Sequence, residues 1–142
     1  MPSVTGRVPN LAEVGPVVPA HILPSEDYVR EVAAAGGATF NPIEVQALFD
    51  TGATKTVVRE DIPRRLGLKP VGFTYLSTGS AQNVLCPLFD LRIILPEQVT
   101  VNGIFAALPL PGQPIECLIG RDILKLGVFI YIGYMNAFTF SI

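Results

Sequence analysis

The sequence predicts a mostly β domain, a small closed barrel with two or three short helices. The chain has 142 residues, which fits one domain with a modest core. Hydrophobic residues make up 49% and charged residues only 15%, which is typical of a compact globule and not of a disordered chain. Most apolar segments are short, rich in β-formers and separated by turn residues, and few have a helical pattern.

The first part of the chain is predicted to contain an arm, a strand and a helix. Residues 1–15 are polar and contain proline, so we expect a loose N-terminal arm before a domain that spans 16–142. Residues 16–24 favour β structure but hold three prolines, which suits an edge strand because proline cannot donate to a ladder. A helix is predicted over 26–35, where Ser25 is a good N-cap, acidic residues follow it and two glycines end it.

The middle of the chain alternates between strands and turns. Residues 43–49, IEVQALF, alternate and then become fully apolar, as in a strand that enters a core. The turn DTGAT and a short strand, TVVRE, come next. A short helix is predicted over 61–68, where Asp61 is the expected cap, Pro63 fits the first turn and Gly67 ends the helix.

The remaining segments predict hairpins and one short helical turn. The tip STGS lies between two β-rich arms, and a further β-rich segment, VTVNGIFAALPL, follows them. Residues 116–127 give an apolar strand, a glycine break, a helical turn and a glycine stop. The aromatic C-terminal segment, residues 128–142, divides around Gly133–Asn136, which predicts a final hairpin.

Charge and composition argue against several function classes. The net charge is -2 and no basic tract is present, which argues against nucleic acid as a partner. No apolar run reaches the ~18 residues that a membrane-spanning helix needs. The N-terminus lacks the charged start and apolar core of a secretory signal, so we expect a cytoplasmic location.

Metal and thiol chemistry are not expected either. The only histidine is His21, which lies among prolines without a catalytic motif beside it. Cys86 and Cys117 are the only cysteines, and neither belongs to a CxxC, so no zinc spacing exists and no metal or other cofactor is expected. One disulfide is possible on paper, but two free buried thiols in a reducing cytosol are the favoured reading.

The stretch LFDTGAT, residues 48–54, places one carboxylate, Asp50, directly after an apolar strand. A lone carboxylate in this position is usually a turn residue that accepts backbone N–H bonds. Thr51 and Gly52 do not decide the matter, because both are ordinary turn residues. From these residues alone, a small β-barrel with a purely structural Asp50 remains one of the hypotheses.

A second, distant segment makes the pattern more specific. LFDTGAT resembles the active-site loop of aspartic proteases, and LIGRD, residues 118–122, resembles the segment that supports this loop. A hairpin with a glycine tip lies between the two, where these proteases have their flap. The order and spacing resemble the retropepsin-like branch, a single-lobe type found in viruses, cells and bacteria, over roughly residues 16–142. The helix at 26–35 is absent from the short viral enzymes and resembles bacterial members.

The resemblance implies a homodimeric aspartic endopeptidase that cuts protein or peptide substrates. Hydrolysis of an amide by water needs a base and an acid, and two carboxylates about 3 Å apart supply both because they share one proton. This chain has a single DTG, so the second acid has to be Asp50 of a symmetry-related copy. The alternative is a peptide-binding or scaffold module of the same fold in which catalysis is weak or vestigial.

The resemblance also assigns roles to the neighbours of Asp50. Thr51 would hydrogen-bond to the partner's loop, the N–H of Gly52 would point at the acid, and the small Ala53 would leave room for substrate. The residues expected to support the loop from beneath are Leu118, Ile119 and Gly120, the last permitting a tight crossing of chains. The flap residues expected to contact a peptide bound as an added strand are Thr78, Gly79 and Ser80.

Two features depart from the viral pattern. Viral enzymes commonly carry an acid after DTGA that pairs with the arginine of the GRD segment, whereas Thr54 and Lys55 follow here, so Arg121 needs another partner. The flap tip also lacks consecutive glycines.

The aromatic segment 128–142 is expected to form the dimer sheet. The alternative is that this segment completes the core of the monomer.

Overall fold

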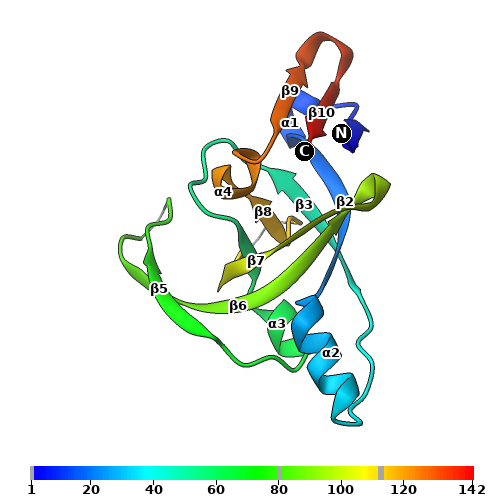
Figure 1. The fold of residues 1–142 in the computed structure, drawn as a ribbon. Helices are drawn as coiled ribbons and strands as arrows, with labels where there is room; N and C mark the ends of the chain where they lie inside the picture. Colours follow the sequence, from blue (N-terminus) through cyan, green and yellow to red (C-terminus); the bar gives the residue numbers. More distant parts are fainter. Residues whose placement is uncertain (1, 80, 112–113) are drawn as a thin grey trace.

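The computed structural model describes residues 2–79, 81–111 and 114–142 (Figure 1). The fold is mostly β, as predicted. The strands are β1 Ser3–Arg7, β2 Val17–Pro24, β3 Ile43–Phe49, β4 Val57–Arg59, β5 Gly72–Leu76, β6 Val84–Leu95, β7 Val99–Leu108, β8 Cys117–Ile119, β9 Val128–Ile132 and β10 Ala137–Ser141. The helices are α1 Leu11–Val14, α2 Glu26–Ala34, α3 Asp61–Arg65 and α4 Arg121–Leu124, with 3-10 turns at η1 Pro96–Gln98 and η2 Gly133–Met135.

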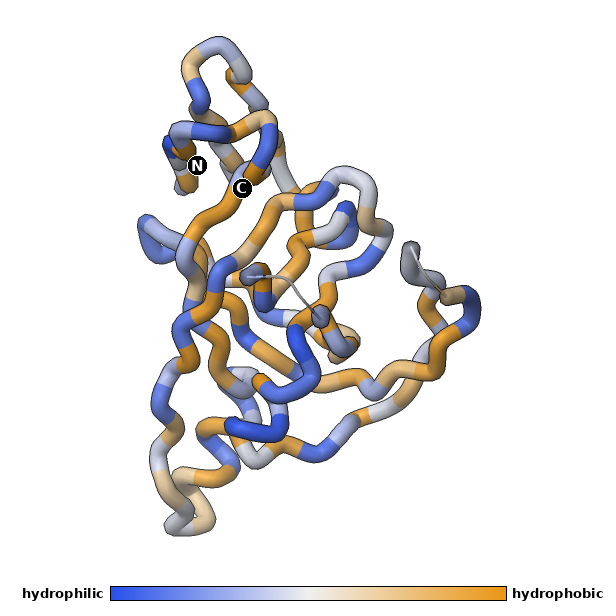
Figure 2. The backbone as a smooth tube through the Cα atoms, turned by 180° about the vertical axis from the view of Figure 1, so that it is seen from behind, coloured by the Kyte–Doolittle hydropathy of each residue, from blue (hydrophilic) through white to orange (hydrophobic). Residues whose placement is uncertain are grey.

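Six strands close into a barrel in the order β2-β3-β8-β4-β7-β6, and β6 pairs back onto β2. The β3–β8 and β4–β7 pairs are parallel, whereas the other pairs are antiparallel. The main core cluster includes Val45, Val58, Leu91, Ile93 and Ile119. Strand β5 extends the sheet beyond β6 and forms with it the hairpin that projects to one side, which carries apolar residues (Figure 2). This closed barrel confirms the predicted fold class.

Strand β2 is not the edge strand that its prolines predicted. Residues 17–22 pair with β3, and residues 21–24 pair with β6, so β2 closes the barrel. Pro19 lies in the part of β2 that pairs with β3 alone, and its missing N–H therefore costs no bond to β6. The proline pattern was compatible with closure because the two ladders overlap only at His21 and Ile22.

The N-terminal arm is more ordered than expected. Residues 3–7 form β1, which pairs along its whole length with β10, so the expectation of a loose segment was wrong here. The cause is the apolar content hidden among polar neighbours: Val4 is fully buried, and a side chain on Gly6 would collide with the ring of Phe138. The division of the chain at residue 16 stays a prediction.

Two helices were predicted close to their observed bounds. Helix α2 begins after Ser25, whose hydroxyl accepts from the backbone N–H of Tyr28 at 3.2 Å, as expected of an N-cap. None of its residues is buried, and it extends away from the barrel (Figure 1). Helix α3 ends at Arg65, and Gly67, expected to end it, follows with a positive φ of 70°; Glu60 is its N-cap residue. Asp61 does not cap the helix, because its carboxylate binds the guanidinium of Arg59.

The final hairpin is present, and its two strands differ in burial. Strand β10 lies between β1 and β9, and its Phe138 and Phe140 are fully buried. Their rings lie 5.8 and 5.5 Å from the ring of Phe49, the residue before Asp50. Strand β9 is at the edge, where Val128 and Ile130 are 53% and 48% exposed. Thus β10 completes the core of the monomer, whereas β9 keeps an apolar, solvent-facing edge.

No helix in the described part of the chain is long and apolar enough to cross a membrane.

Candidate active site

Asp50 stands where β3 leaves the barrel. The parallel pairing of Phe49 with Ile119 fixes its height, and the N–H of Asp50 donates to the carbonyl of Ile119 at 2.8 Å. The N–H of Gly52 donates to Asp50 Oδ1 at 2.9 Å, and the N–H of Ala53 donates to the Asp50 carbonyl at 3.1 Å. The carboxylate is half-buried at the start of a tight turn, with Oδ2 accepting no hydrogen bond from the described residues. The contact expected from Gly52 is therefore present.

The chain crosses itself beneath this loop. A side chain on Gly120 would lie 2.6 Å from the carbonyl carbon of Lys55 and 3.0 Å from the carbonyl oxygen of Ala53. Only glycine fits such a crossing without moving backbone. Leu118 and Ile119, one half-buried and one fully buried, continue β8 under the loop. We call residues 50–56 and 117–122 together the floor of the site.

A buried hydroxyl and a carboxylate lock the floor together. Thr56, 1% exposed, donates its backbone N–H to both oxygens of Asp122 at 3.0 Å and its hydroxyl to Asp122 Oδ1 at 2.7 Å. The same hydroxyl accepts from the N–H of Gly120 at 3.0 Å, and the N–H of Ile123 donates to Asp122 Oδ1 at 2.9 Å. Sequence reasoning missed this pair. The available signals were a polar residue at the entrance of a buried strand and an acid at the start of a helix, but no local pattern joins them.

Arg121 binds the Asp50 loop, and its partners there are a carbonyl and a hydroxyl. One guanidinium nitrogen donates to the carbonyl of Thr51 at 2.6 Å, and another donates to the hydroxyl of Thr54 at 3.1 Å. The backbone N–H of Arg121 also donates to the carbonyl of Ala53 at 2.8 Å. The hydroxyl of Thr54 therefore takes up the contact that an acid would have made, and the arginine keeps three points of attachment to the loop.

The flap hairpin is formed by β5 and β6, with Leu76 opposite Val84 at the last pair. In the tip, the N–H of Thr78 donates to the carbonyl of Ala81 at 2.7 Å, and the N–H of Ala81 donates to the hydroxyl of Thr78 at 3.0 Å. Thr78 and Gly79 are exposed, and no atom lies within 4 Å of a side chain built on Gly79. Ser80, the third predicted flap residue, lies outside the described residues.

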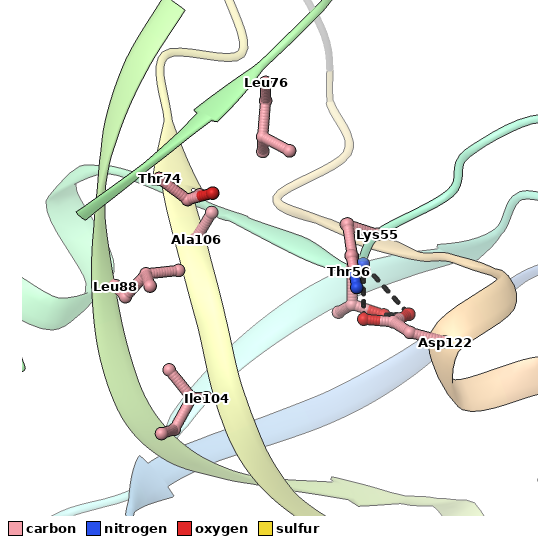
Figure 3. A pocket seen from close by; sticks show the side chains of 8 residues that line it. All are labelled: Lys55, Thr56, Thr74, Leu76, Leu88, Ile104, Ala106 and Asp122. Atoms are coloured by element: carbon pink, nitrogen blue, oxygen red, sulfur yellow. Dashed lines mark hydrogen bonds between the residues drawn. The ribbon is translucent and has the colours of Figure 1, made fainter. Parts of the chain in front are cut away.

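A cavity of about 210 Å³ separates the flap from the floor (Figure 3). It is lined by Lys55, Thr56, Thr74, Leu76, Leu88, Ile104, Ala106 and Asp122. Asp50 does not line it, whereas Lys55 and Thr56, which follow Asp50 in the same loop, do. A second, more open depression of about 360 Å³ involves residues 39–43, Arg65 and Leu66 and none of the predicted site residues. The first cavity is therefore the one that shares residues with the Asp50 loop.

The remaining nucleophiles and metal ligands are not arranged for catalysis. Both cysteines are free and buried, and burial raises the pKa of the Cys117 thiol to about 12, which keeps it protonated. Burial also raises the pKa of Cys86. Among the described residues, no group of three or more histidine, cysteine or acidic side chains could hold a metal ion. Asp50 is therefore the side chain in this region best placed for chemistry.

Comparison with known proteins agrees with this geometry. Residues 36–123 match the model of a family described as aspartyl protease, and the match includes both the Asp50 loop and the Gly120 crossing. The chain belongs to this aspartyl protease family. A comparison with curated proteins found no match.

Solved structures with a similar fold include three proteins from different sources. The retroviral protease-like domain of Ddi1 from Leishmania major has a TM-score of 0.52 at 17% identity, over 88% of this chain and 86% of that domain. The Simian Foamy Virus (mac) protease has a TM-score of 0.48 at 16% identity, over 78% of this chain and 92% of that one. A retropepsin-like aspartic protease from Rickettsia conorii has a TM-score of 0.46 at 14% identity, over 97% of this chain and 92% of that one. The Leishmania domain shares the fold with this chain.

Proposed function

We propose that this protein is a homodimeric aspartic endopeptidase whose catalytic dyad is Asp50 and Asp50 of a second copy. The observation that carries the proposal is that the ordered loop of the site holds one carboxylate, whereas the chemistry needs two. Gly120 lets the chain cross tightly beneath the loop, the guanidinium of Arg121 binds the loop, and the buried Thr56 binds Gly120. We call the contact of Arg121 with the loop the arginine clamp. The loop so held offers a single carboxylate. Asp50 Oδ1 is bound by the N–H of Gly52, and Oδ2 is left for a partner.

Acid–base chemistry explains what two such loops would do. Two carboxylates in close contact cannot both ionise cheaply, so the pair would hold one proton between them. The ionised member would take a proton from a water molecule, while the protonated member would hydrogen-bond the carbonyl of the bond to be cut. The apparent pKa values would belong to the pair and not to either residue. Thr51, exposed at the top of the loop, is the residue we expect to contact the partner's loop.

Strand β9 is our candidate for the dimer interface. Its edge is unpaired within the described chain, and Val128 and Ile130 are about half exposed. An exposed apolar edge strand is a template for pairing with another chain. Strand β9 also follows α4, which begins with the arginine that binds the catalytic loop. A two-fold partner seated on β9 would therefore be coupled to the floor.

Substrate would bind as an extended peptide between the flap and the floor. The flap hairpin would add main-chain hydrogen bonds, and its closure would exclude water from the dyad. The exposed Thr78 and Gly79 are the flap residues we expect to contact it, together with Ser80. Ala53, which is small and partly exposed, would let the peptide approach Asp50.

The decisive experiment compares the wild type with Asp50→Asn on a peptide library between about pH 4 and pH 7. We expect the variant to lose cleavage by about 10²–10⁴-fold or more, because neither member of the dyad could then act as the base. Asp27→Asn, on the exposed helix α2, is the matched control and should cut like the wild type. A wild type that is dimeric in solution and cuts no better than Asp50→Asn would contradict the proposal and favour a peptide-binding module.

A second experiment tests the dimer itself. Ile130→Glu introduces a charge on the exposed edge of β9 and should shift sedimentation velocity from dimer to monomer, with loss of cleavage. Ala34→Glu at the end of the exposed α2 serves as the control, and both variants should keep the wild-type circular dichroism spectrum. Full cleavage by a monomeric Ile130→Glu variant would be incompatible with a dyad shared between copies.

A further inference from the structure

The cavity between flap and floor has two unlike walls. The wall formed by the strands β5, β6 and β7 is mostly apolar; beside Thr74 it consists of Leu76, Leu88, Ile104 and Ala106. Lys55, Thr56 and Asp122 face them from the floor (Figure 3). Because Lys55 and Thr56 belong to the same loop as Asp50, a side chain in this cavity would belong to a residue close to the bond that is cut.

The charges on the polar wall are not equivalent. Both oxygens of Asp122 are occupied by the backbone N–H and hydroxyl of Thr56 and by the N–H of Ile123. Lys55 is exposed, and its ammonium group has no ion pair or hydrogen bond among the described residues. Asp122 keeps its negative charge but is held by partners within the floor, so Lys55 is the charged group of this cavity without a partner among the described residues. An apolar wall with one free cation at its edge suits a side chain that has an aliphatic stem and an anionic end.

We propose that this cavity selects an acidic side chain of the substrate, glutamate above all, and that Lys55 is the residue that determines this preference. The inference rests on the proposed endopeptidase function and adds a substrate class to it. The two methylenes of glutamate would lie on Leu76, Leu88 and Ile104, and its carboxylate would reach the Lys55 ammonium. Glutamine has the same shape without the charge, and lysine in the same place would be repelled.

The test begins with a randomised peptide library cut by the wild-type protein near pH 6 and read by mass spectrometry. We expect glutamate to be enriched at one position near the cut. Two peptides that differ only by glutamate or glutamine at that position then give the quantity of interest. The ratio of their kcat/KM values should be about two- to fivefold in favour of glutamate, as expected of an ion pair at an exposed site.

Variants of Lys55 separate charge from shape. Lys55→Gln should bring the ratio close to one, Lys55→Glu should favour a lysine peptide, and Lys55→Arg should keep the preference for glutamate. Lys69→Gln, an exposed lysine that does not line the cavity, is the matched control and should keep the wild-type ratio. Thermal melting should be unchanged in the Lys55 variants, because the Lys55 side chain is exposed.

The pH profile provides a readout that a structural role would not move. The wild-type preference should fade below about pH 4.3, where the glutamate of the peptide becomes protonated. Asp122 is the other titratable group that lines the cavity, and it is present in both wild type and Lys55→Gln. The difference between their two profiles therefore isolates the contribution of Lys55.

The outcomes distinguish this inference from the function on which it rests. No cleavage of any peptide by the wild type would overturn the proposed function. Cleavage without a preference for glutamate, or with a preference that survives in Lys55→Gln, would overturn the role of Lys55 and leave the endopeptidase intact.

Discussion

The floor of the site and the flap hairpin face each other across one cavity, but they are held in different ways. The floor is tied by side chains within its own chain: Thr56 to Asp122 and Gly120, and Arg121 to the loop. The flap presents Phe73 and Tyr75 outward, 63% and 66% exposed, while Thr74 and Leu76 face the cavity. The side-chain contacts of the floor therefore fix its geometry within the monomer. Under the proposed function, contacts with substrate would fix part of the geometry of the flap.

Two glycines give the sharpest test of this difference. Gly120→Ala would place a methyl group 2.6 Å from backbone atoms of Lys55, so we expect a loss of more than about 3 kcal/mol of folding free energy. Gly79→Ala in the flap meets no atom within 4 Å and should change stability by less than about 1 kcal/mol. Urea unfolding of both variants measures the contrast, and equal losses would mean that the floor can relax.

A threonine in each region gives the next largest effect. Thr56→Val removes a buried hydroxyl, leaving the Gly120 N–H without its acceptor, and should cost about 2–3 kcal/mol. Thr74→Val on the inner face of the flap should stay within about 0.5 kcal/mol. Thr56→Ser keeps the hydroxyl and should recover most of the loss. A stable Thr56→Val protein would show that the network does not hold the floor.

Arg121→Lys tests the contact between the Arg121 guanidinium and the Asp50 loop. Lysine keeps the charge but cannot bind the Thr51 carbonyl and the Thr54 hydroxyl in the same forked geometry. We expect kcat/KM to fall about tenfold, equivalent to about 1.4 kcal/mol, with a smaller change in melting temperature. A variant with wild-type kcat/KM would show that the forked contact of Arg121 does not help to position Asp50.

The smallest expected effect concerns an ion-pair cluster outside the floor, where Arg59 in β4 binds Asp61 and Glu116. The side-chain hydrogen bond from Arg59 holds the pKa of Asp61 below its usual value. The folded state thus favours the ionised acid, and its contribution is present above the unfolded pKa of about 3.9 and lost as the pH falls through the lower folded value. Denaturant midpoints should drop between about pH 5 and pH 2.5, less steeply in Asp61→Asn. Parallel profiles for the two proteins would contradict this.

Local patterns predicted the elements that position Asp50. The alternation in residues 43–49 predicted the strand that carries it, whereas the tight crossing at Gly120 was expected from the resemblance to aspartic proteases. The Thr56–Asp122 pair was not predicted, because a hydrogen bond between residues 66 positions apart leaves no periodicity in either segment. The same reason explains β2, whose proline content is local whereas its second ladder, with β6, is not.

The final hairpin shows another limit of sequence reasoning. Strands β9 and β10 both read as aromatic β segments, and the sequence left open whether they build a dimer sheet or the core of the monomer. The structure divides them: Phe138 and Phe140 point into the core, while Val128 and Ile130 remain exposed. Which face a strand buries depends on its neighbours, and here the neighbour is β1, at the opposite end of the chain.

The pairing of the two chain ends has a consequence for the order of folding. Phe49, which precedes Asp50, is surrounded by the rings of Phe129, Phe138 and Phe140, all of which come much later in the sequence. Pairing Ser3 with Ser141 closes nearly the whole chain into one loop, the kind of contact that forms slowly. We therefore expect the strand that carries Asp50 to be secured only after residues 128–141 have been made, so that the position of Asp50 would be fixed late in folding.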